Sequence, residues 1–174
     1  MEKKEYRRFY IGVDIGKSGA IVIQEKGEIA CYEMPMIKTE LDYQALHQLL
    51  EPYEAGNGLV VFEKLGVIFG TSKSTAFSMG HQSGAIEMCC VALSIPFVKV
   101  PPKQWQQVMF TGVDEIKRSN IKVKSGESRD TKAMSVLACK RRFPQVRLNF
   151  GGKAIKPDDN LCDALLMSEF AKNL

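Results

Sequence analysis

Two apolar runs near the N-terminus, separated by a turn that contains glycine, constrain the fold more than any other feature. The stretch FYIGVDIGKSGAIVIQ covers residues 9–24, and β-branched and aromatic residues flank its GKSG segment. This pattern predicts a strand, a tight turn and a second strand. Three further strands are predicted in the apolar stretches at 28–35, 58–65 and 96–102.

Between and after these strands the apolar residues recur at helical spacing. Helices are predicted at 39–53, 74–95, 102–110, 130–144 and 159–174. Thr39 or Asp42 could cap the first of them, and Asp130 or Thr131 the fourth. The polar, basic stretch 111–130 has weak periodicity and is predicted to be a mobile loop. Hairpin strands followed by alternating helices and strands indicate a mixed α/β sheet with helices on its faces.

The charge of the chain is uneven along its length. Its 174 residues suit one domain, and the net charge is only +4. Lysines and arginines nevertheless cluster between Lys117 and Arg147, where only Glu127 and Asp130 oppose them. That cluster is either an ordinary solvated face or a surface that meets phosphate groups.

The five cysteines, at 31, 89, 90, 139 and 162, form no CxxC pair. Their irregular spacing favours reduced, mostly buried thiols in a cytoplasmic compartment. The charged N-terminus MEKKEYRR lacks the apolar segment of a secretory signal, and no apolar run reaches the roughly 20 residues of a membrane span.

Two of the predicted buried strands each carry an acidic residue. Asp14 interrupts the first strand, and Glu63 ends the apolar run LVVF. Acids in such places are costly unless they are paired or bind a cation. The simpler alternatives are that Asp14 stabilises the turn before Gly16 and that Glu63 is a surface residue paired with Lys64.

A second pair of acids lies on the last predicted helix, in the segment KPDDNLCDALL. Asp159 and Asp163 are four residues apart, so they share one helix face and repel each other. Capping by Asp158 or Asp159 would explain one acid but not Asp163. Mg²⁺ would explain both, because it prefers carboxylate oxygens. Four converging acids could hold two ions about 4 Å apart, the arrangement that suits in-line phosphodiester attack.

The ordered set GVDIGKSGA, VFEK, FSMGHQSGAIEMCC, VPPKQW and DDNLCDALLMSEFA resembles the RuvC-like Holliday-junction resolvases, and most closely their phage-type branch. The resemblance spans roughly residues 9–171. It implies a ribonuclease-H-like fold, with a mixed five-stranded sheet flanked by helices, over a single domain of residues 1–174. It also implies a homodimer in the bacterial or phage-infected cytoplasm that nicks two opposed strands of branched DNA, a four-way junction, with Mg²⁺ or Mn²⁺.

The resemblance also implies roles for individual residues. Asp14, Glu63, Asp159 and Asp163 match the family's four metal-binding catalytic acids. The cellular bacterial enzymes space the last two acids three apart, whereas here Asn160 holds that position, so Asp158 competes with Asp159. A lysine near the scissile phosphate is matched best by Lys132, whose alternative is an ordinary exposed lysine. Weaker candidates for that lysine are Lys103 and Lys124.

Other residues are candidates for contacts with DNA or with a second subunit. Phe69 lies in a glycine-rich loop after the catalytic strand, and it either stacks at the junction or anchors the loop in the core. Gly80 and Gly84 form either a dimer seam or a close contact with the protein's own sheet, and Trp105 is predicted to be core. The remaining predicted DNA contacts are Lys73, Ser74, Lys103, Lys117, Arg118, Lys122 and Lys124.

Three other functions compete with a junction resolvase. GVDIGKSGA also resembles the first phosphate loop of sugar and acetate kinases, but the chain is short for such an enzyme and lacks a second such loop. A non-catalytic DNA-binding module would not need the complete acid set. A nuclease for RNA/DNA hybrids or other branched DNA stays open, because a fold does not determine a substrate.

Overall fold

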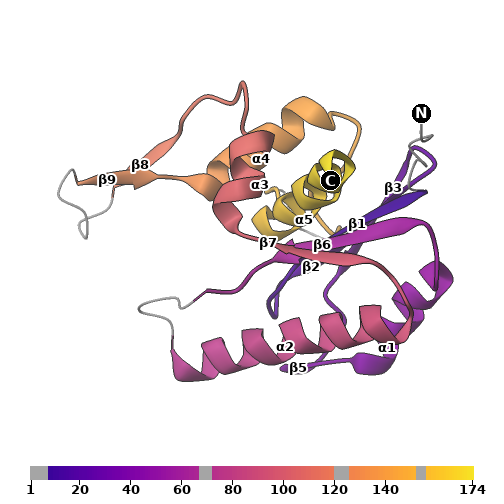
Figure 1. The fold of residues 1–174 in the computed structure, drawn as a ribbon. Coiled ribbons are helices and arrows are strands. Elements are labelled where there is room, and N and C mark those ends of the chain that lie inside the picture. Colours follow the sequence, from indigo (N-terminus) through magenta and orange to yellow (C-terminus); the bar gives the residue numbers. More distant parts are fainter. Residues whose placement is uncertain (1–7, 67–71, 120–125, 152–155) are drawn as a thin grey trace.

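A five-stranded mixed sheet forms the centre of the molecule (Figure 1). The computed structural model describes residues 8–66, 72–119, 126–151 and 156–174. The strands lie in the order β3-β2-β1-β6-β7. Their bounds are β1 Phe9–Asp14, β2 Ala20–Glu25, β3 Glu28–Glu33, β6 Gly58–Glu63 and β7 Phe97–Val100. The first three strands pair antiparallel, while β6 joins β1 and β7 in parallel, which confirms the predicted mixed sheet.

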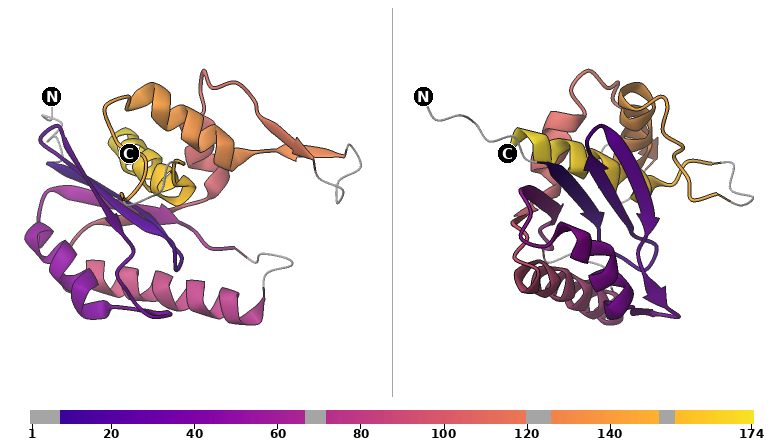
Figure 2. Two further views of the ribbon diagram at one scale, coloured as in Figure 1. Left: turned by 180° about the vertical axis from the view of Figure 1, so that it is seen from behind. Right: turned by 90° about the vertical axis from the view of Figure 1, so that its right-hand side faces the viewer.

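Helices cover both faces of this sheet (Figure 2). One face carries α1 (Tyr43–Leu50) and the long α2 (Lys73–Ala92), and the other carries α3 (Pro102–Met109), α4 (Thr131–Arg142) and α5 (Asp159–Phe170). The apolar side chains form a separate core on each face. The short elements are β4 Met36–Ile37, β5 Glu40–Leu41, η1 Glu51–Tyr53 and η2 Ala171–Asn173.

The N-termini of α1 and α4 show which of the predicted capping residues is used. Asp42 accepts a hydrogen bond from the Ala45 amide at 2.9 Å and caps α1. Asp130 does the same for α4 through the Ala133 amide at 3.1 Å. In both cases the aspartate, rather than the nearby threonine, satisfies an amide that the helix leaves free.

The prediction of a mobile loop over residues 111–130 is wrong for part of that stretch. Strands β8 (Lys117–Ser119) and β9 (Glu127–Arg129) pair antiparallel in a ribbon that projects from the body of the molecule (Figure 1). The base of the ribbon is anchored, because the Arg129 guanidinium lies 5.5 Å from the centre of the Phe110 ring. Polar strands exposed on both sides carry no apolar alternation, so the sequence pattern gave no strand signal here.

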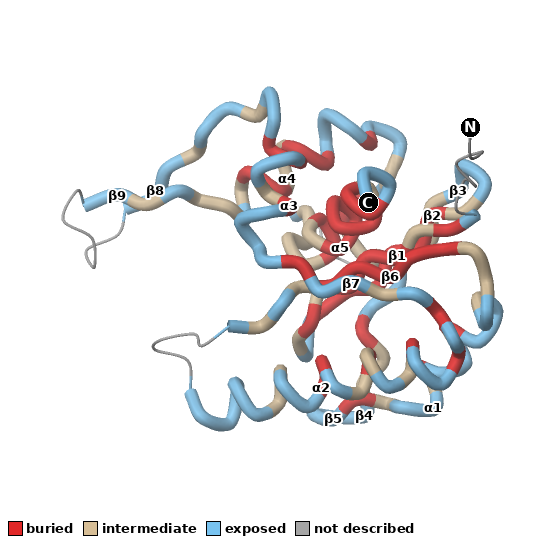
Figure 3. The backbone as a smooth tube through the Cα atoms, in the orientation of Figure 1, coloured by how far each residue is buried: buried red, intermediate tan, exposed pale blue. Residues whose placement is uncertain are grey.

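Helix α5 lies against the sheet more closely than a side chain would permit. A Cβ atom at Gly12 of β1 would lie 2.0 Å from the Ala164 carbonyl oxygen and 2.4 Å from the Ser168 amide. Glycine at this position therefore lets α5 cross β1 in backbone contact. Most of α5 is buried as a result, as Figure 3 shows.

All five cysteines are free thiols, and Cys90, Cys139 and Cys162 are buried, as predicted. In the part of the chain that the structure describes, no helix combines the length and the apolar character needed to cross a membrane.

Candidate active site

The four predicted acids lie at the ends of three neighbouring elements. Asp14 and Glu63 end the adjacent parallel strands β1 and β6, so both face the same edge of the sheet. Asp159 begins α5, and Asp163 precedes the Ala164 contact with Gly12. The close crossing of α5 over β1 therefore brings the helix acids to the strand acids.

The electrostatics of the acids show that they influence one another. Burial, followed by the charges of Asp163 and Glu63, raises the pKa of Asp14 from 3.8 to about 8. Burial also raises the pKa of Asp163 to about 7, with further contributions from Glu63 and Asp159 and an opposing one from the Ser135 hydroxyl. Such raised values indicate a cluster of carboxylates that cannot all ionise without a cation.

The Glu63 carboxylate is hydrogen-bonded to Trp105, which was predicted from the sequence only as a core residue. The indole Nε1 of Trp105 donates a hydrogen bond to Glu63 Oε1 at 2.9 Å, and Trp105 is completely buried. Burial raises the pKa of Glu63, and this hydrogen bond lowers it. A buried tryptophan normally needs a partner for its N–H, which is the signal that could have pointed to this role. The predicted surface pair of Glu63 with Lys64 is not what engages this carboxylate.

Lys132, the candidate for a lysine near the scissile phosphate, lies beside the acids. Its ammonium group forms an ion pair with Asp159 Oδ2. That hydrogen-bonded contact raises the pKa of Lys132, although the side chain remains mostly exposed. Lys132 therefore offsets part of the repulsion between Asp159 and Asp163.

Asp158 has a different task from Asp159. Its Oδ1 accepts hydrogen bonds from the amides of Asn160, at 2.9 Å, and Leu161, at 3.1 Å, and so caps α5. Asn160 in turn donates to the Ser18 carbonyl at 2.8 Å, which ties the β1–β2 turn to the start of α5. Asp158 and Asp159 are both candidates for the metal-binding acid at the start of α5. They differ because only the Asp158 carboxylate accepts the hydrogen bonds that cap the helix.

The acid cluster fits a hard divalent cation by its chemistry. Oδ1 of Asp163 is buried and accepts no hydrogen bond from any described residue. Unpartnered carboxylate oxygens are the ligands that Mg²⁺ prefers. Among the described residues, however, no three His, Cys, Asp or Glu side chains are already arranged as a group that could hold a metal ion.

The predicted DNA-contacting residues are spread around this end of the sheet. Lys73 and Ser74 are exposed in the first turn of α2, Lys103 is exposed on α3, and Lys117 and Arg118 are exposed on β8. Lys117 lies 3.7 Å from Glu127 across the ribbon. Both the ribbon and the N-terminal end of α2 project in the same direction, on opposite faces of the sheet (Figures 1 and 2). Phe69, Lys122 and Lys124 lie outside the described residues.

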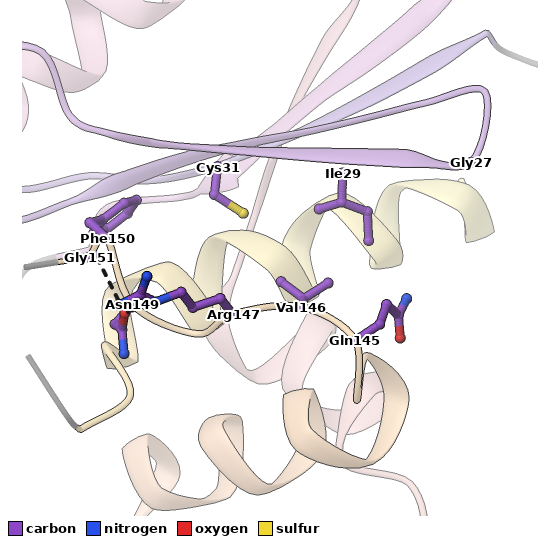
Figure 4. A pocket seen from close by; sticks show the side chains of 9 residues that line it. All are labelled: Gly27, Ile29, Cys31, Gln145, Val146, Arg147, Asn149, Phe150 and Gly151. Atoms are coloured by element: carbon purple, nitrogen blue, oxygen red, sulfur yellow. Dashed lines mark hydrogen bonds between the residues drawn. The ribbon is translucent and has the colours of Figure 1, made fainter.

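A cavity of about 490 Å³ lies elsewhere, between β3 and the segment that follows α4 (Figure 4). Its walls include Ile29, Cys31, Val146 and Phe150, and the Arg147 side chain is tied to Asn149 at 2.7 Å. None of the predicted site residues lines this cavity. It is therefore a feature separate from the acid cluster.

Comparison with known proteins identifies the fold but no family. No protein-family model matches the chain, and no curated protein matches it. Among solved structures, RuvC from Thermus thermophilus is similar with 16% identity, 93% of this chain and 92% of that chain covered, and a TM-score of 0.54. The T. thermophilus RuvC in complex with a Holliday junction substrate gives 13% identity, 94% and 92% coverage, and a TM-score of 0.56. The chain therefore has a ribonuclease-H-like fold, as predicted.

Proposed function

We propose that this protein is a metal-dependent endonuclease that resolves four-way DNA junctions by paired, symmetric nicks. The observation that carries the proposal is the convergence of Asp14, Glu63, Asp159 and Asp163 at one edge of a ribonuclease-H-like sheet. One or two Mg²⁺ or Mn²⁺ ions bound there would activate water and stabilise the leaving oxygen. The fold shared with a junction-bound RuvC supports the choice of substrate.

The acids, Trp105, Lys132 and the exposed cations have different roles in this proposal. The four carboxylates hold the metal, and Trp105 keeps Glu63 oriented by its hydrogen bond. Lys132 neutralises Asp159 when the site is empty, and it is placed to stabilise charge on a scissile phosphate when DNA is bound. The exposed cations Lys73, Lys103, Lys117 and Arg118 contact phosphates on either side of the cut strand, together with Ser74.

Symmetric nicks require two active sites related by a two-fold axis, so we propose a homodimer. Helix α2 offers a suitable surface, because Phe77, Met88 and Val91 are exposed on it. An added Cβ at Gly80 or Gly84 would meet nothing within 4 Å, so these glycines do not pack on the protein's own sheet. That finding contradicts the sheet-packing alternative and favours the seam between subunits. A Met88→Lys variant should sediment as a monomer.

Three finer assignments complete the proposal. The four-residue spacing of Asp159 and Asp163 supports the phage-type branch of the RuvC-like resolvases. Residues 1–174 form one nuclease domain, since both cores are built on the same sheet. The free cysteines are consistent with a cytoplasmic protein.

The experiment that tests the function uses three labelled substrates: a synthetic four-way junction, a duplex and an RNA/DNA hybrid. Each is incubated with Mg²⁺, Mn²⁺ or EDTA. The matched variants are Asp159→Asn and Asp158→Asn. Asparagine caps helices as well as aspartate does, so Asp158→Asn should keep its activity, whereas Asp159→Asn should lose a metal ligand and its activity.

Paired nicks confined to the junction, dependent on metal and lost only in Asp159→Asn, would establish the proposal. Cutting of the hybrid instead would keep the metal site and reject the substrate. Junction binding without cutting in either metal would indicate a non-catalytic binding module. Equal loss in both variants would show that the acid assignment within α5 is wrong.

A further inference from the structure

A second cleft opens next to the acid cluster, on the opposite face of the sheet. It lies between the β1–β2 turn and the first half of α2, and its volume is about 300 Å³. That volume is at the lower end of the range for small-molecule sites and leaves room for about one nucleotide. The cleft begins two residues after Asp14. The cleft is lined by Gly16, Lys17, Ser74, Thr75, Ser78, Met79 and Gln82.

The first half of α2 lines this cleft with both polar and apolar side chains. Farther along α2 the buried positions are Ile86 and Cys90, which belong to the apolar core. One turn before Ile86 the buried position is Gln82, and before it come Ser78 and Thr75. Toward the active-site end of the sheet, the helix face that turns toward the protein therefore carries polar side chains beside the apolar Met79.

Gln82 is the residue that points to a ligand. Only 2% of it is exposed, yet its Oε1 accepts no hydrogen bond from any described residue. Its Nε2 donates to Ser78 Oγ in a long contact of 3.4 Å. If the two amide atoms exchange places, the unpaired atom becomes a donor instead of an acceptor. In either orientation a buried amide is left with one unsatisfied polar atom, which destabilises the folded protein unless a ligand pairs with it.

The other lining residues suit a phosphate. Lys17 is exposed at the tip of the turn, and its turn is held in place by the Asn160 contacts to Ser18. Ser72 caps α2 by accepting from the Thr75 amide at 3.1 Å, so the positive end of the helix dipole faces the same region. The hydroxyls of Ser74 and Thr75 contact the Ser72 hydroxyl at 3.0 and 2.8 Å and retain further hydrogen-bonding capacity.

We infer that this cleft binds one nucleotide of the cleaved DNA strand, next to the scissile phosphate. Lys17 and the serine and threonine hydroxyls hold its phosphate, and the Gln82 amide pairs with the edge of its base. The base would thereby contribute to sequence preference, because a buried amide discriminates between partners that satisfy it and partners that do not. This inference rests on the proposed nuclease function, and it gives a role to a polar group that the fold alone does not use.

The test measures DNA binding and thermal stability of the full chain with Gln82→Met and Lys17→Gln. Binding of a fluorescent junction, duplex and single strand is measured in Ca²⁺, a hard cation with the same oxygen ligands as Mg²⁺. Gln82→Met should weaken binding about 3- to 10-fold, the scale of one hydrogen bond. Its melting temperature should stay the same or rise, because the variant removes an unsatisfied buried group. Lys17→Gln should weaken binding and lower the salt dependence by about one phosphate contact.

Two matched controls separate the cleft from general effects. Gln107→Met changes an exposed amide on α3, and Lys172→Gln removes a cation at the far end of the chain, where it pairs with Glu169. Neither control should alter binding as much as its partner variant in the cleft.

The outcomes distinguish this inference from the proposed function. A junction-cutting protein whose cleft variants bind DNA like their controls would overturn the cleft alone. A Gln82→Met protein that melts lower but binds normally would show a structural role for the amide and would also overturn it. Weakened binding of a duplex or single strand, in a protein that ignores junctions, would support the cleft and reject the junction. A wild-type protein that binds none of the three DNAs would overturn both.

Discussion

The two faces of the central sheet use their helices in opposite ways. Helix α5 is buried on nearly all sides and crosses β1 in backbone contact at Gly12. Helix α2 is longer, but it leaves Phe77, Met88 and Val91 exposed, and Gly84 faces open space. A tightly packed helix holds acids in fixed positions, whereas an open helix leaves surface for DNA and for a second subunit. The first face accordingly carries the candidate chemistry, while candidate DNA contacts lie on both faces and the candidate subunit contact lies on the second.

The largest effect is expected from Asp163→Asn on the buried face. Loss of this proposed metal ligand should reduce junction cleavage about 10³-fold or more, since a bound ion supplies several kcal/mol of transition-state stabilisation. The melting temperature at pH 8 without metal should rise, because the variant removes a buried charge. Single-turnover cleavage and thermal melting measure the two effects, and an unchanged cleavage rate would remove Asp163 from the site.

The free energy of unfolding should depend on pH, because Asp14 is harder to ionise in the folded protein than in the unfolded chain. The folded protein holds a proton on Asp14 up to a pH of about 8, whereas the unfolded chain releases it near the ordinary pKa of 3.8. Without metal, the free energy of unfolding should therefore fall as pH rises from about 4 to about 8, by an amount of the order of several kcal/mol.

Asp14→Asn is the control for this pH effect and should flatten the decline. Mg²⁺ should stabilise the wild type most at high pH, because metal binding requires deprotonated ligands. Urea unfolding at several pH values, with EDTA or Mg²⁺, gives the comparison. A stability that does not depend on pH in EDTA would show that burial and the neighbouring acids do not raise the pKa of Asp14.

Gly12→Ala should be strongly destabilising. The new methyl group would lie 2.0 Å from the Ala164 carbonyl, so α5 must move away from β1. Overpacking typically costs about 1–3 kcal/mol, and contact with backbone places this substitution at the upper end of that range. Urea unfolding measures the loss, and a change below about 1 kcal/mol would contradict the close crossing.

Trp105→Phe should keep most of the core packing and remove the hydrogen bond to Glu63. We expect the apparent Mg²⁺ affinity to fall about 10- to 100-fold, as for other residues that orient metal ligands. Calorimetric titration measures the affinity, and the same substitution in a Glu63→Gln background provides the double-mutant cycle. If the two effects simply add, Trp105 acts through packing rather than through Glu63.

Gly84→Ala should have the smallest effect and the opposite sign to Gly12→Ala. The added methyl group meets nothing within 4 Å, and alanine stabilises a helix by about 0.5–1 kcal/mol relative to glycine. The proposed dimer should tolerate this methyl group less well than the monomer does. Melting at concentrations where the protein is monomeric isolates the gain, and a loss of stability there would contradict the open position.

Several features could be predicted from local patterns. Alternation and helical spacing predicted the five strands of the sheet and the helices α1–α5 of the described residues, because apolar periodicity reflects which side of an element is buried. The helix predicted at 39–53 was wrong at its start, where β5 (Glu40–Leu41) pairs with β4. The acids stood out for the complementary reason, since Asp14, Glu63 and Asp163 interrupt patterns that are otherwise apolar. The β8–β9 ribbon escaped prediction because its strands are exposed on both sides and so carry no such period.

The sequence by itself determined the strands of the main sheet, the helices around it, their order and the residues that are costly to bury, because these depend on local periodicity and on side-chain chemistry. Only the tertiary structure decided that Trp105 donates to Glu63, that Lys132 pairs with Asp159, and that Gln82 is buried with an unpaired amide atom. Those contacts join residues from different elements. Their geometry is set by how closely α5 and α2 approach the sheet, and no local pattern encodes that distance.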